Sequence, residues 1–341
     1  MTGATWWAAL SGGVDSAVAA LLAQREGRRV AGVTLRFLDG DEPVREARRV
    51  ADALEIEHRV IDMRDRFASE VIGPFIDAYV AGLTPNPCVG CNETMKFGAL
   101  LEWVREEGGA GVVTGHYARV EQTLRGPRIA RALDEAKDQS YFLYRLDPGL
   151  LGRIEFPLGR LAKAEVRAEA SRAGLPVAEH PESQDVCFLD GRSAGEYVCA
   201  HRAAACRPGD VVDLSGRPIG THRGICHYTV GQRKGLPGGE GPLYVVRVDA
   251  EQNVIVAGPP EACEGTHVDV HDAIWHGGPA DDVTVKVRAR MPAVRARVVR
   301  SAGGLAIDFE SPVCAAPGQA AVCYAGDVVV GGGTIAKGSA G

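Results

Sequence analysis

The sequence predicts an α/β protein with a doubly wound parallel sheet, followed by a small mostly-β central domain and a C-terminal antiparallel β-barrel. In the first part, β-branched apolar runs alternate with helical patterns, which is typical of βαβ units. Near residue 190 the pattern changes to short β-branched runs separated by Gly and Pro, which is typical of small barrels. These observations predict three domains, at residues 1–190, 191–262 and 263–341.

The elements of the first domain are predicted from apolar runs and the residues that break them. We expect strands at 6–10, 29–37, 58–63 and 111–114, and helices at 17–23, 43–54, 67–80 and 93–107. Gly73-Pro74 should break or kink the third of these helices, and a loop begins at Thr84. Ligands of doubly wound sheets bind beyond the carboxyl ends of the strands. The loop after the first strand, Leu35 and Gly115-His116 should therefore meet in one crevice.

The remainder of the chain is predicted as strands and turns. Residues 208–220 form strand and turn, 229–239 a glycine-rich basic loop, and 243–257 a hairpin. The barrel strands are expected at 283–287, 296–300, 305–309, 319–324 and 328–335. Within the last of these runs, Gly331-Gly332-Gly333 is interpreted as a turn.

The composition is that of an ordinary globular protein. Of the 341 residues, 45% are hydrophobic and 24% charged, and no apolar run approaches the roughly 18 residues of a membrane span. Because no secretory signal pattern opens the sequence, we expect a cytoplasmic protein. We take a monomer as the default oligomeric state. An odd number of cysteines, nine, then argues against a structural disulfide framework. The net charge of −6 argues only mildly against nucleic acid, since phosphate contacts need one local basic surface.

The most informative stretch is Ser11-Gly12-Gly13-Val14-Asp15-Ser16, between the first strand and an Ala/Leu-rich helix. Glycines let backbone N–H groups turn toward an anion, and a helix N-terminus favours phosphate. Asp15 or Ser16 is placed to cap that helix. The spacing fits neither a Walker A loop nor a dinucleotide fingerprint. It resembles the PP-loop of ATP pyrophosphatases, which cut ATP to AMP and pyrophosphate; an ordinary strand-to-helix turn is the alternative.

Three cysteines stand out. Cys88 and Cys91 form a C-x-x-C in a proline-delimited loop before a helix, and proximity to a helix N-terminus lowers the pKa of a thiol. The alternatives are half of a zinc site, although no second pair follows at finger spacing, or a thioredoxin-like motif. For Cys187, between Val186 and Phe188, the alternative is plain burial. The others are interpreted as core or incidental: Cys199, Cys206, Cys226, Cys263, Cys314 and Cys323.

A basic run near the C-terminus has no acid within it; it comprises Lys286, Arg288, Arg290, Arg295, Arg297 and Arg300. Alternate residues of a strand share a face, so this run predicts a phosphate-facing surface, with an ordinary solvated β face as the alternative. The basic loop Gln232-Arg233-Lys234-Gly235 favours nucleic acid. His116 is either a crevice residue or simply a hydrogen-bonded histidine at a strand end, and Lys137 to Gln139 could be a solvated turn.

Together these motifs are similar to the tRNA-specific 2-thiouridylases, bacterial enzymes that thiolate the wobble uridine of tRNA. The resemblance runs almost end to end. It rests on the PP-loop and six further motifs in the same order: TPNPCVGCN (84–92), TGHYAR (114–119), KDQSYFLY (137–144), ESQDVCF (182–188), TVGQRKGL (229–236) and PGQAAVCY (317–324). It implies an ATP-dependent sulfurtransferase that adenylates the uridine and replaces its 2-oxo oxygen with sulfur, releasing AMP and pyrophosphate.

The resemblance also implies roles for individual residues. Cys187 would carry a persulfide received from a cysteine desulfurase or a sulfur-relay protein, and Cys91 would be its partner and nucleophile, able to form a disulfide with it. ATP with Mg²⁺ would be held by Ala9, Leu10, Ser11, Gly12, Gly13, Val14, Asp15, Ser16, Leu35 and Gly115. The anticodon loop of tRNA would contact Asn86, Pro87, Cys88, His116, Lys137, Asp138, Gln139, Arg288, Ala289 and Gln319.

One position departs from the family pattern. Cys88 stands where many members have Asp, which puts a carboxylate role at this position in doubt. The third thiol also allows an alternative in which Cys88, Cys91 and Cys187 hold a [4Fe–4S] cluster whose open iron binds sulfide. The motifs also leave room for a different PP-loop tRNA-modifying enzyme, or for a non-catalytic RNA-binding protein with a relic nucleotide site.

Overall fold

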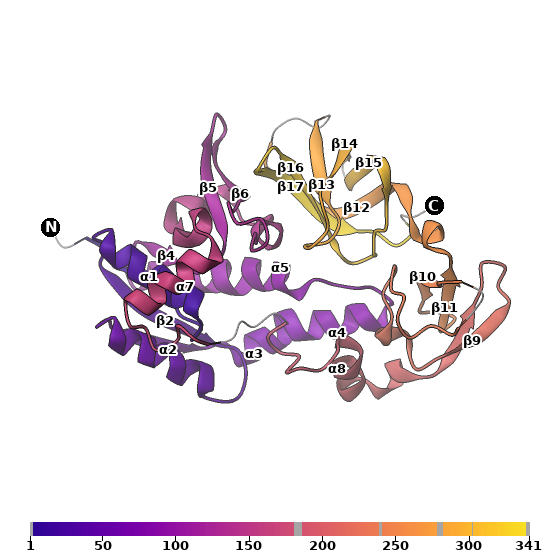
Figure 1. Ribbon diagram of the computed structural model, residues 1–341, viewed down its shortest axis with the longest axis horizontal. Coiled ribbons are helices and arrows are strands. Elements are labelled where there is room, and N and C mark those ends of the chain that lie inside the picture. Colours follow the sequence, from indigo (N-terminus) through magenta and orange to yellow (C-terminus); the bar gives the residue numbers. More distant parts are fainter. Residues whose placement is uncertain (1–2, 181–185, 239–240, 278–281, 302, 339–341) are drawn as a thin grey trace. The chain divides into compact units, whose positions relative to one another are not determined.

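The computed structural model describes residues 3–180, 186–238, 241–277, 282–301 and 303–338 (Figure 1). The chain forms two compact units. Unit 1 comprises residues 1–71, 88–184 and 327–329, and unit 2 comprises residues 72–87, 185–326 and 330–341. The three-domain boundaries expected from the sequence stay a prediction. Among the described residues, none of the helices combines the length and apolar character needed to cross a membrane.

Unit 1 is built on a five-stranded parallel sheet in the order β3-β2-β1-β4-β7. Its strands are β1 (Trp6–Ala9), β2 (Val30–Arg36), β3 (His58–Asp62), β4 (Gly111–Val113) and β7 (Ile154–Glu155). From β1 the chain builds the sheet first on one side, through β2 and β3, and then on the other, through β4. The topological switch point, where such sheets bind ligands, therefore lies at the carboxyl ends of β1 and β4.

Helices cover both faces of this sheet, which confirms the doubly wound prediction. On one face, α1 (Val14–Arg25), α2 (Glu42–Ala53) and α7 (Lys163–Arg172) share a core with Ala8 and Leu10. On the other face, Trp7 packs edge-on against Trp103 of α6 (Leu100–Glu106), with ring centroids 4.7 Å apart. Successive side chains of a strand point to opposite faces of the sheet, so Trp7 and Ala8 lie in different cores.

Two long helical stretches contain π-helical segments. The first runs through α3 (Arg64–Phe67), η1 (Ala68–Ile72) and α4 (Gly73–Val80), with the irregularity just before the predicted Gly73-Pro74 break. The second runs through α5 (Pro87–Cys91), η2 (Asn92–Ala99) and α6. It begins six residues earlier than predicted, because Pro87 takes the first helical position, where a missing N–H costs nothing. Cys88 and Cys91 therefore lie inside the first turns of a helix, and their prediction as loop residues was wrong.

A hairpin and several short helices of unit 1 were not predicted. The hairpin joins β5 (Ala118–Thr123) to β6 (Gly126–Arg131) through a two-residue turn, and Ala130 pairs with Val328 of the segment 327–329. Both strands are rich in polar residues, so their apolar alternation is weak. The 3₁₀ helices are η3 (Ser140–Leu143), η4 (Pro148–Arg153) and η5 (Pro157–Arg160).

The middle of unit 2 is a mixed sheet in the order β10-β11-β8-β9, in which only β8 and β11 pair in parallel. The strands are β8 (Gly209–Val212), β9 (Pro218–His222), β10 (Tyr244–Asp249) and β11 (Val254–Gly258). Before the sheet come α8 (Ala194–His201) and η6 (Ala203–Cys206), and η7 (Ile225–His227) follows β9. This arrangement confirms the small mostly-β central domain.

The C-terminal part of unit 2 is an antiparallel barrel, as predicted, but it has six strands where five were expected, because its first strand was not predicted. It follows η8 (Pro260–Cys263) and consists of β12 (Gly265–Trp275), β13 (Val283–Lys286), β14 (Val294–Ser301), β15 (Gly304–Val313), β16 (Ala320–Ala325) and β17 (Val328–Ile335). Pairing of β12 with β17 closes it. The glycine triplet lies within β17, so its interpretation as a turn was wrong. A Cβ at Gly331 would approach the Ile274 carbonyl oxygen to 2.5 Å, so glycine permits the closing strands to approach.

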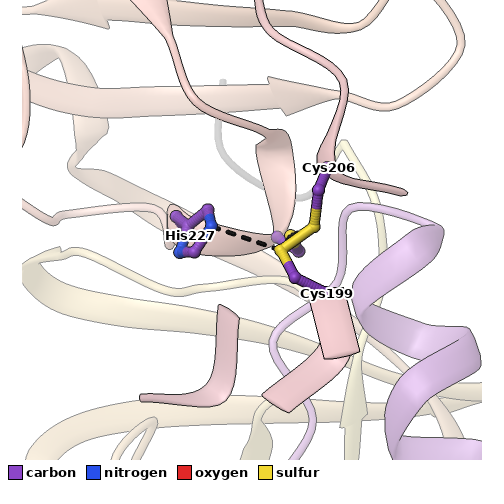
Figure 2. A group of neighbouring side chains, drawn as sticks. Cys199, Cys206 and His227 are labelled. Atoms are coloured by element: carbon purple, nitrogen blue, oxygen red, sulfur yellow. Dashed lines mark hydrogen bonds between the residues drawn. A yellow bond between two sulfur atoms is a disulfide. The ribbon is translucent and has the colours of Figure 1, made fainter. Parts of the chain in front are cut away.

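The expectation that the cysteines form no structural disulfide was also wrong. Cys199 near the end of α8 and Cys206 at the end of η6 form a disulfide, with Cα atoms 5.6 Å apart (Figure 2). The chain reverses between these two short helices, which brings together cysteines only seven residues apart. Their interpretation as core or incidental residues is corrected accordingly.

Candidate functional site

The PP-loop turns sharply between β1 and α1. Gly12 has φ of +78°, and a Cβ there would lie 2.9 Å from the Cβ of Glu46. Gly13 is the N-cap of α1, and no side chain in the described part of the chain caps this helix, so the predicted capping by Asp15 or Ser16 was wrong. Ser16 instead closes the loop, because its Oγ accepts from the Ser11 N–H at 3.1 Å and donates to the Gly13 carbonyl at 3.0 Å. The first N–H groups of α1 thus face the switch point without a capping side chain.

The other residues predicted to hold ATP surround this loop. Ala9 ends β1, Leu10 is buried beside it, Val14 begins α1, and Leu35 lies near the end of β2. Gly115 follows β4 and its backbone lies close to the PP-loop, since a Cβ at this position would lie 2.6 Å from the Asp15 carbonyl carbon and the Ser16 nitrogen. The structure therefore brings Gly115 against the PP-loop at the carboxyl ends of adjacent strands.

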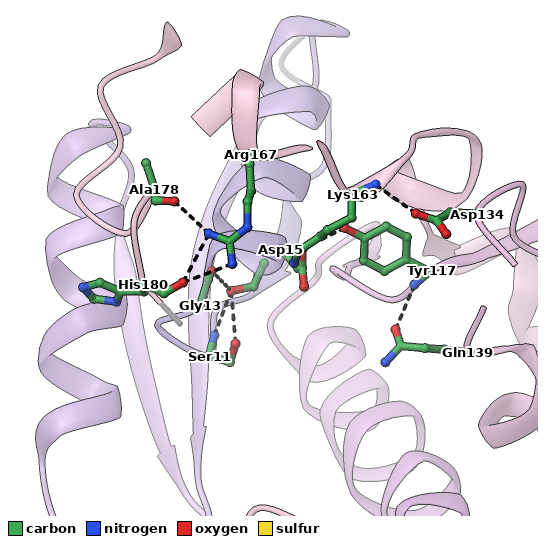
Figure 3. Close-up of polar contacts among 11 residues, drawn as sticks. Ser11, Gly13, Asp15, Tyr117, Asp134, Gln139, Lys163, Arg167, Ala178 and His180 are labelled. Carbon is green, nitrogen blue, oxygen red and sulfur yellow. Dashed lines mark hydrogen bonds and ion pairs between the residues drawn. The ribbon is translucent and has the colours of Figure 1, made fainter. Parts of the chain in front are cut away.

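Asp15 is held in an ion pair that sequence reasoning missed. Figure 3 shows Tyr117 and Lys163 directed at this carboxylate: Oδ1 accepts from the Tyr117 hydroxyl at 2.9 Å and from Lys163 Nζ at 2.6 Å. The Lys163 side chain is only 12% exposed and its residue begins α7. A cation thus lies beside the phosphate-binding turn. No local motif marks Lys163, because 148 residues separate it from its partner.

The C-x-x-C helix presents two thiols of different exposure. Cys91 is buried at 7% exposure, and Cys88 is partly buried. Burial raises the pKa of the Cys88 thiol, an effect that the charge of Lys96 partly offsets. The lowered pKa expected for a cysteine at a helix N-terminus is therefore wrong for Cys88, because desolvation outweighs the nearby positive charge. Lys96, in the π-helical segment, is a second cation that sequence reasoning missed.

His116 is a buried residue linked to this helix. Its Nδ1 lies 2.7 Å from Thr114 Oγ1, its Nε2 lies 3.5 Å from Lys96 Nζ, and its ring packs near Phe97. Burial and then the Lys96 charge lower its pKa well below 6.5, so the ring is neutral. An ammonium group only donates, which assigns the acceptor role to Nε2 and the proton to Nδ1, which donates to Thr114. This geometry matches the hydrogen-bonded alternative for His116.

The buried neutral His116 predicts an acid-dependent loss of stability. Below about pH 6.5 the unfolded chain protonates this residue while the folded chain does not, so acidification lowers the free energy of unfolding. Replacing His116→Gln should reduce the slope of that free energy below pH 6.5 by up to about 1.4 kcal/mol per pH unit. Urea unfolding at a series of pH values measures it. His267→Gln is the control: Asp308 raises the pKa of His267, so its contribution is lost above pH 6.5 instead. Equal slopes below pH 6.5 for wild type and His116→Gln would contradict the prediction.

Three sequence motifs meet at Thr84 in unit 2. The Thr84 N–H donates to the Pro317 carbonyl at 2.8 Å, and Gln319 Nε2 donates to the Thr84 carbonyl at 2.8 Å. Thr84 Oγ1 bonds to Thr229 Oγ1 at 3.1 Å. Gly318, with φ of +89°, allows this approach, since a Cβ there would lie 3.0 Å from the Thr84 nitrogen. The segment that leads through Asn86 into Pro87 and Cys88 is thus held by the barrel and by the basic loop.

Several predicted tRNA contacts also have partners within the protein. Asp138 Oδ1 accepts from the Ala132 N–H at 3.0 Å, and Gln139 Oε1 accepts from the Tyr117 N–H at 2.9 Å, so both shape the turn that contains Lys137. Arg288 donates to the Val230 carbonyl at 2.7 Å and precedes the partly buried Ala289. Their tRNA contacts stay predictions.

Cys187 is exposed, so the alternative of plain burial was wrong. The next residue, Phe188, is buried and anchors the segment, with its ring centroid 5.0 Å from that of Phe75. Residues 182–185 of the ESQDVCF motif lie outside the described residues. Cys187 belongs to unit 2 and Cys91 to unit 1, so their pairing stays a prediction.

The basic residues of unit 2 occupy two places. Arg295 and Arg297 are exposed on β14 and alternate with buried Ala296 and Val298, as the strand pattern predicts, whereas Arg288 is directed at Val230. Arg297 lies opposite Asp308 in the register of β14 and β15. A cavity of about 510 Å³ lies beside the basic loop, lined by Pro208, Thr221, His222, Arg223, His227, Tyr228, Gln232, Lys234 and Gly235.

Comparisons with known proteins agree with this architecture. Residues 5–191 match a family model described as a tRNA methyl transferase HUP domain, 196–259 a tRNA methyl transferase PRC-barrel domain, and 266–335 an aminomethyltransferase β-barrel domain. The chain is 44% identical to the tRNA-specific 2-thiouridylase MnmA of Rhodospirillum centenum, covering 97% of this chain and 91% of that protein. The chain belongs to the tRNA-specific 2-thiouridylase family.

Other thiouridylases give the same result. The chain is 42% identical to the tRNA-specific 2-thiouridylase MnmA of Xanthobacter autotrophicus, covering 96% of this chain and 92% of that protein. It is 43% identical to that of Cereibacter sphaeroides, covering 97% of this chain and 94% of that protein. Membership of the thiouridylase family favours an enzyme over the relic RNA-binding protein considered from the sequence.

Proposed function

We propose that this protein is an ATP-dependent tRNA sulfurtransferase, which adenylates the wobble uridine and replaces its 2-oxo oxygen with sulfur. The observation that carries the proposal is the PP-loop at the switch point, where no described side chain caps the start of α1. The Asp15–Lys163 ion pair lies beside this loop, and Cys88 and Cys91 belong to the same unit. Membership of the thiouridylase family supports the choice of base and of sulfur chemistry. The protein acts in the cytoplasm, as a monomer, on one tRNA at a time.

ATP activates the uridine because a carbonyl oxygen is a poor leaving group. The PP-loop, with Leu35 and Gly115, holds the nucleotide, and the N–H groups at the start of α1 bind its phosphates. Uridine O2 attacks the α-phosphorus and pyrophosphate leaves, so that AMP becomes the leaving group at C2. Asp15 has a carboxylate of the kind that would hold Mg²⁺, and the ion would neutralise phosphate charge.

Sulfur transfer requires two thiols with different roles. A cysteine desulfurase or relay protein first loads Cys187 with a persulfide. The terminal sulfur attacks C2, and AMP departs with the former uridine oxygen. The Cys91 thiolate then attacks Sγ of Cys187, so the persulfide bond breaks, the outer sulfur stays on the base, and a Cys91–Cys187 disulfide forms. A dithiol reductant returns both residues to thiols and is itself oxidised to a disulfide.

The tRNA must present an unstacked base to this chemistry. Recognition of single-stranded loops by RNA-binding proteins relies on splayed bases, so the anticodon loop fits as the substrate region. The proposed contacts are those expected from the sequence: Asn86, Pro87, Cys88, His116, Lys137, Asp138, Gln139, Arg288, Ala289 and Gln319. Internal hydrogen bonds of Asp138, Gln139, Arg288 and Gln319 support a further role of these four side chains in positioning the segments that would touch RNA.

Mass spectrometry of tRNA tests the proposal. We expect that incubation with ATP and a persulfide donor replaces one oxygen by one sulfur in the wobble uridine, and that AMP and pyrophosphate are released. A tRNA with cytidine at the wobble position is the matched control and should gain no sulfur. Unchanged tRNA, together with no tRNA-dependent pyrophosphate release, would overturn the proposed function.

Replacing Lys163→Met should weaken use of ATP. The variant removes the cation beside the phosphate-binding turn and leaves Asp15 with only the Tyr117 hydroxyl of its two donors. We expect tRNA-dependent pyrophosphate release to fall by about 10²-fold in kcat/KM, within the range found when one electrostatic group is lost. Lys163→Arg, which keeps the charge, should retain more activity than Lys163→Met. Equal kcat/KM for Lys163→Met and wild type would exclude this role.

The [4Fe–4S] alternative makes a different prediction. Cys88, Cys91 and Cys187 would hold the cluster, which would supply an open iron for sulfide. The raised pKa of Cys88 does not favour a thiolate ligand at that position. Iron and sulfide analysis of anaerobically purified protein distinguishes the two, because the persulfide mechanism requires neither.

A further inference from the structure

Four side chains in the middle of unit 2 gather at one point, away from the PP-loop and its cysteines. They come from α8, η6 and η7, and their sulfur and nitrogen atoms all lie within 4.8 Å of one another. We call this group the Cys/His cluster; it consists of Cys199, Cys206, Cys226 and His227. Figure 2 shows the His227 ring directed at the sulfurs. Three cysteines and one histidine are a ligand set that structural zinc sites use.

Apart from the bonded pair Cys199 and Cys206, the distances within the Cys/His cluster are close to those between the ligands of a tetrahedral ion. Zn–S bonds of about 2.3 Å and a Zn–N bond of about 2.0 Å place tetrahedral ligands about 3.8 Å (S to S) and about 3.5 Å (S to N) apart. Cys226 Sγ lies 3.6 Å from Cys199 Sγ and 3.5 Å from Cys206 Sγ. His227 Nε2 lies 3.3 Å from Cys199 Sγ. We propose that the Cys/His cluster binds one Zn²⁺ ion.

Local packing prepares these side chains for a cation. Gly195, in the first turn of α8, leaves room for the His227 ring, since a Cβ at 195 would overlap it. Gly224, with φ of +128°, lets the backbone of η7 approach Cys206, whose Cα would lie 2.9 Å from a Cβ at 224. Histidine ligates zinc through a nitrogen of its neutral imidazole. Arg223 lies close enough to act electrostatically on Cys226 and His227, and Glu196 acts on His227 with the opposite charge.

The Cys199–Cys206 disulfide is the oxidised, metal-free form of the same cluster. A dithiol reductant transfers two electrons to it, breaks the S–S bond and is itself oxidised to a disulfide. The two sulfurs take up two protons and become thiols. Zn²⁺ then displaces one proton from each of the three cysteines, and neutral His227 completes the site without losing a proton. The reducing conditions expected for a cytoplasmic protein favour the metal-bound form.

A metal here would order the basic loop that follows His227. The His227 carbonyl accepts from Gln232 Nε2 at 3.2 Å, and Gln232 Oε1 accepts from the Thr229 N–H at 3.1 Å. Fixing His227 through its ring therefore fixes the start of the loop that contains Arg233 and Lys234. The site is structural, because the chain itself supplies four ligands and no open position remains.

Metal analysis of the full chain, purified with a dithiol reductant and without chelator, tests the proposal. We expect about one zinc per chain by mass spectrometry, and sulfur ligands at about 2.3 Å and a nitrogen ligand at about 2.0 Å from the metal by X-ray absorption. Cys226→Ser should reduce the bound zinc at least about 10-fold. Cys263→Ser, which changes a buried cysteine outside the Cys/His cluster, and Cys187→Ser should keep it.

Cobalt substitution covers the case in which Cys226→Ser does not fold. Co²⁺ in the wild-type protein should give intense tetrahedral d–d bands and sulfur-to-metal charge transfer. His227→Cys keeps four ligands and should bind Co²⁺ with a shifted spectrum. Less than about a tenth of an equivalent of zinc in reduced protein, with no tetrahedral cobalt spectrum, would overturn the site. So would alkylation mapping that shows Cys199 and Cys206 still joined after dithiol treatment, or zinc that is lost with Cys187→Ser but kept in Cys226→Ser.

Discussion

Cys187→Ser should abolish sulfur incorporation while leaving activation of the uridine intact. A serine hydroxyl cannot carry a persulfide, and Cys187 is exposed, so the change leaves no cavity in a packed core. We expect at least about a 10³-fold loss of thiolation, the scale seen when a covalent nucleophile is removed. Release of pyrophosphate in the presence of tRNA should stay within a few-fold of wild type. Quantifying thiolated uridine and pyrophosphate in one reaction measures both effects.

The matched control for Cys187→Ser is Cys263→Ser. Cys263 is buried and donates to the Pro260 carbonyl at 3.0 Å, a bond that a serine hydroxyl can replace. This variant should thiolate at close to the wild-type rate. Full thiolation by Cys187→Ser would contradict the persulfide mechanism, and loss of thiolation by both variants would show that the effect is not specific to Cys187.

Gly115→Ala should disable the nucleotide site. A Cβ at this position would lie 2.6 Å from the backbone of Asp15 and Ser16, and backbone atoms cannot rotate away as a flexible side chain can. The PP-loop must therefore shift. Displacement of a positioning group by about 1 Å costs on the order of 10²-fold in rate, so pyrophosphate release should fall by that factor. Overpacking should also lower the free energy of unfolding by about 1–3 kcal/mol.

Gly152→Ala separates this steric effect from the general effect of replacing a glycine. Gly152 also lies in unit 1, within η4, and a Cβ there meets nothing within 4 Å. We expect normal pyrophosphate release and an unchanged or slightly higher free energy of unfolding, because alanine restricts the unfolded chain. Kinetic assays and urea unfolding of both variants measure the difference. Normal activity in Gly115→Ala would show that the PP-loop tolerates displacement.

The order of the strands and helices from β1 to β4 was predictable because apolar periodicity is a local property of the chain. Strands buried on both faces, such as Val30–Arg36, stand out as continuous β-branched runs. The predictions failed where tertiary contacts decide the local structure. The Gly331-Gly332-Gly333 stretch is a strand because barrel closure with β12 needs a close approach. The hairpin at 118–131 was missed because its polar strands gave no clear alternation.

The candidate site was predictable only where one motif held several of its residues. The PP-loop is such a motif, and Gly115 could be placed beside it from the rule that strand ends converge. Lys163 and Lys96 could not be found in this way, since each meets its partner through tertiary packing. The Cys/His cluster was missed because its spacing, seven residues and then twenty, follows no finger pattern. The pKa of Cys88 depended on burial, which sequence position alone does not give.

The hydrogen bonds around Thr84 bear on how the protein can be shortened or evolved. The segment that leads into the helix with the two cysteines is held at Thr84 by hydrogen bonds to Pro317, Gln319 and Thr229. A truncated version that lacks the barrel would lose two of these three hydrogen-bond partners, even if its nucleotide-binding fold were complete. Sequence changes in the turn at 317–319 should therefore affect the segment that leads into the helix with Cys88 and Cys91. A minimal enzyme built from this scaffold must retain that turn or supply a substitute for it.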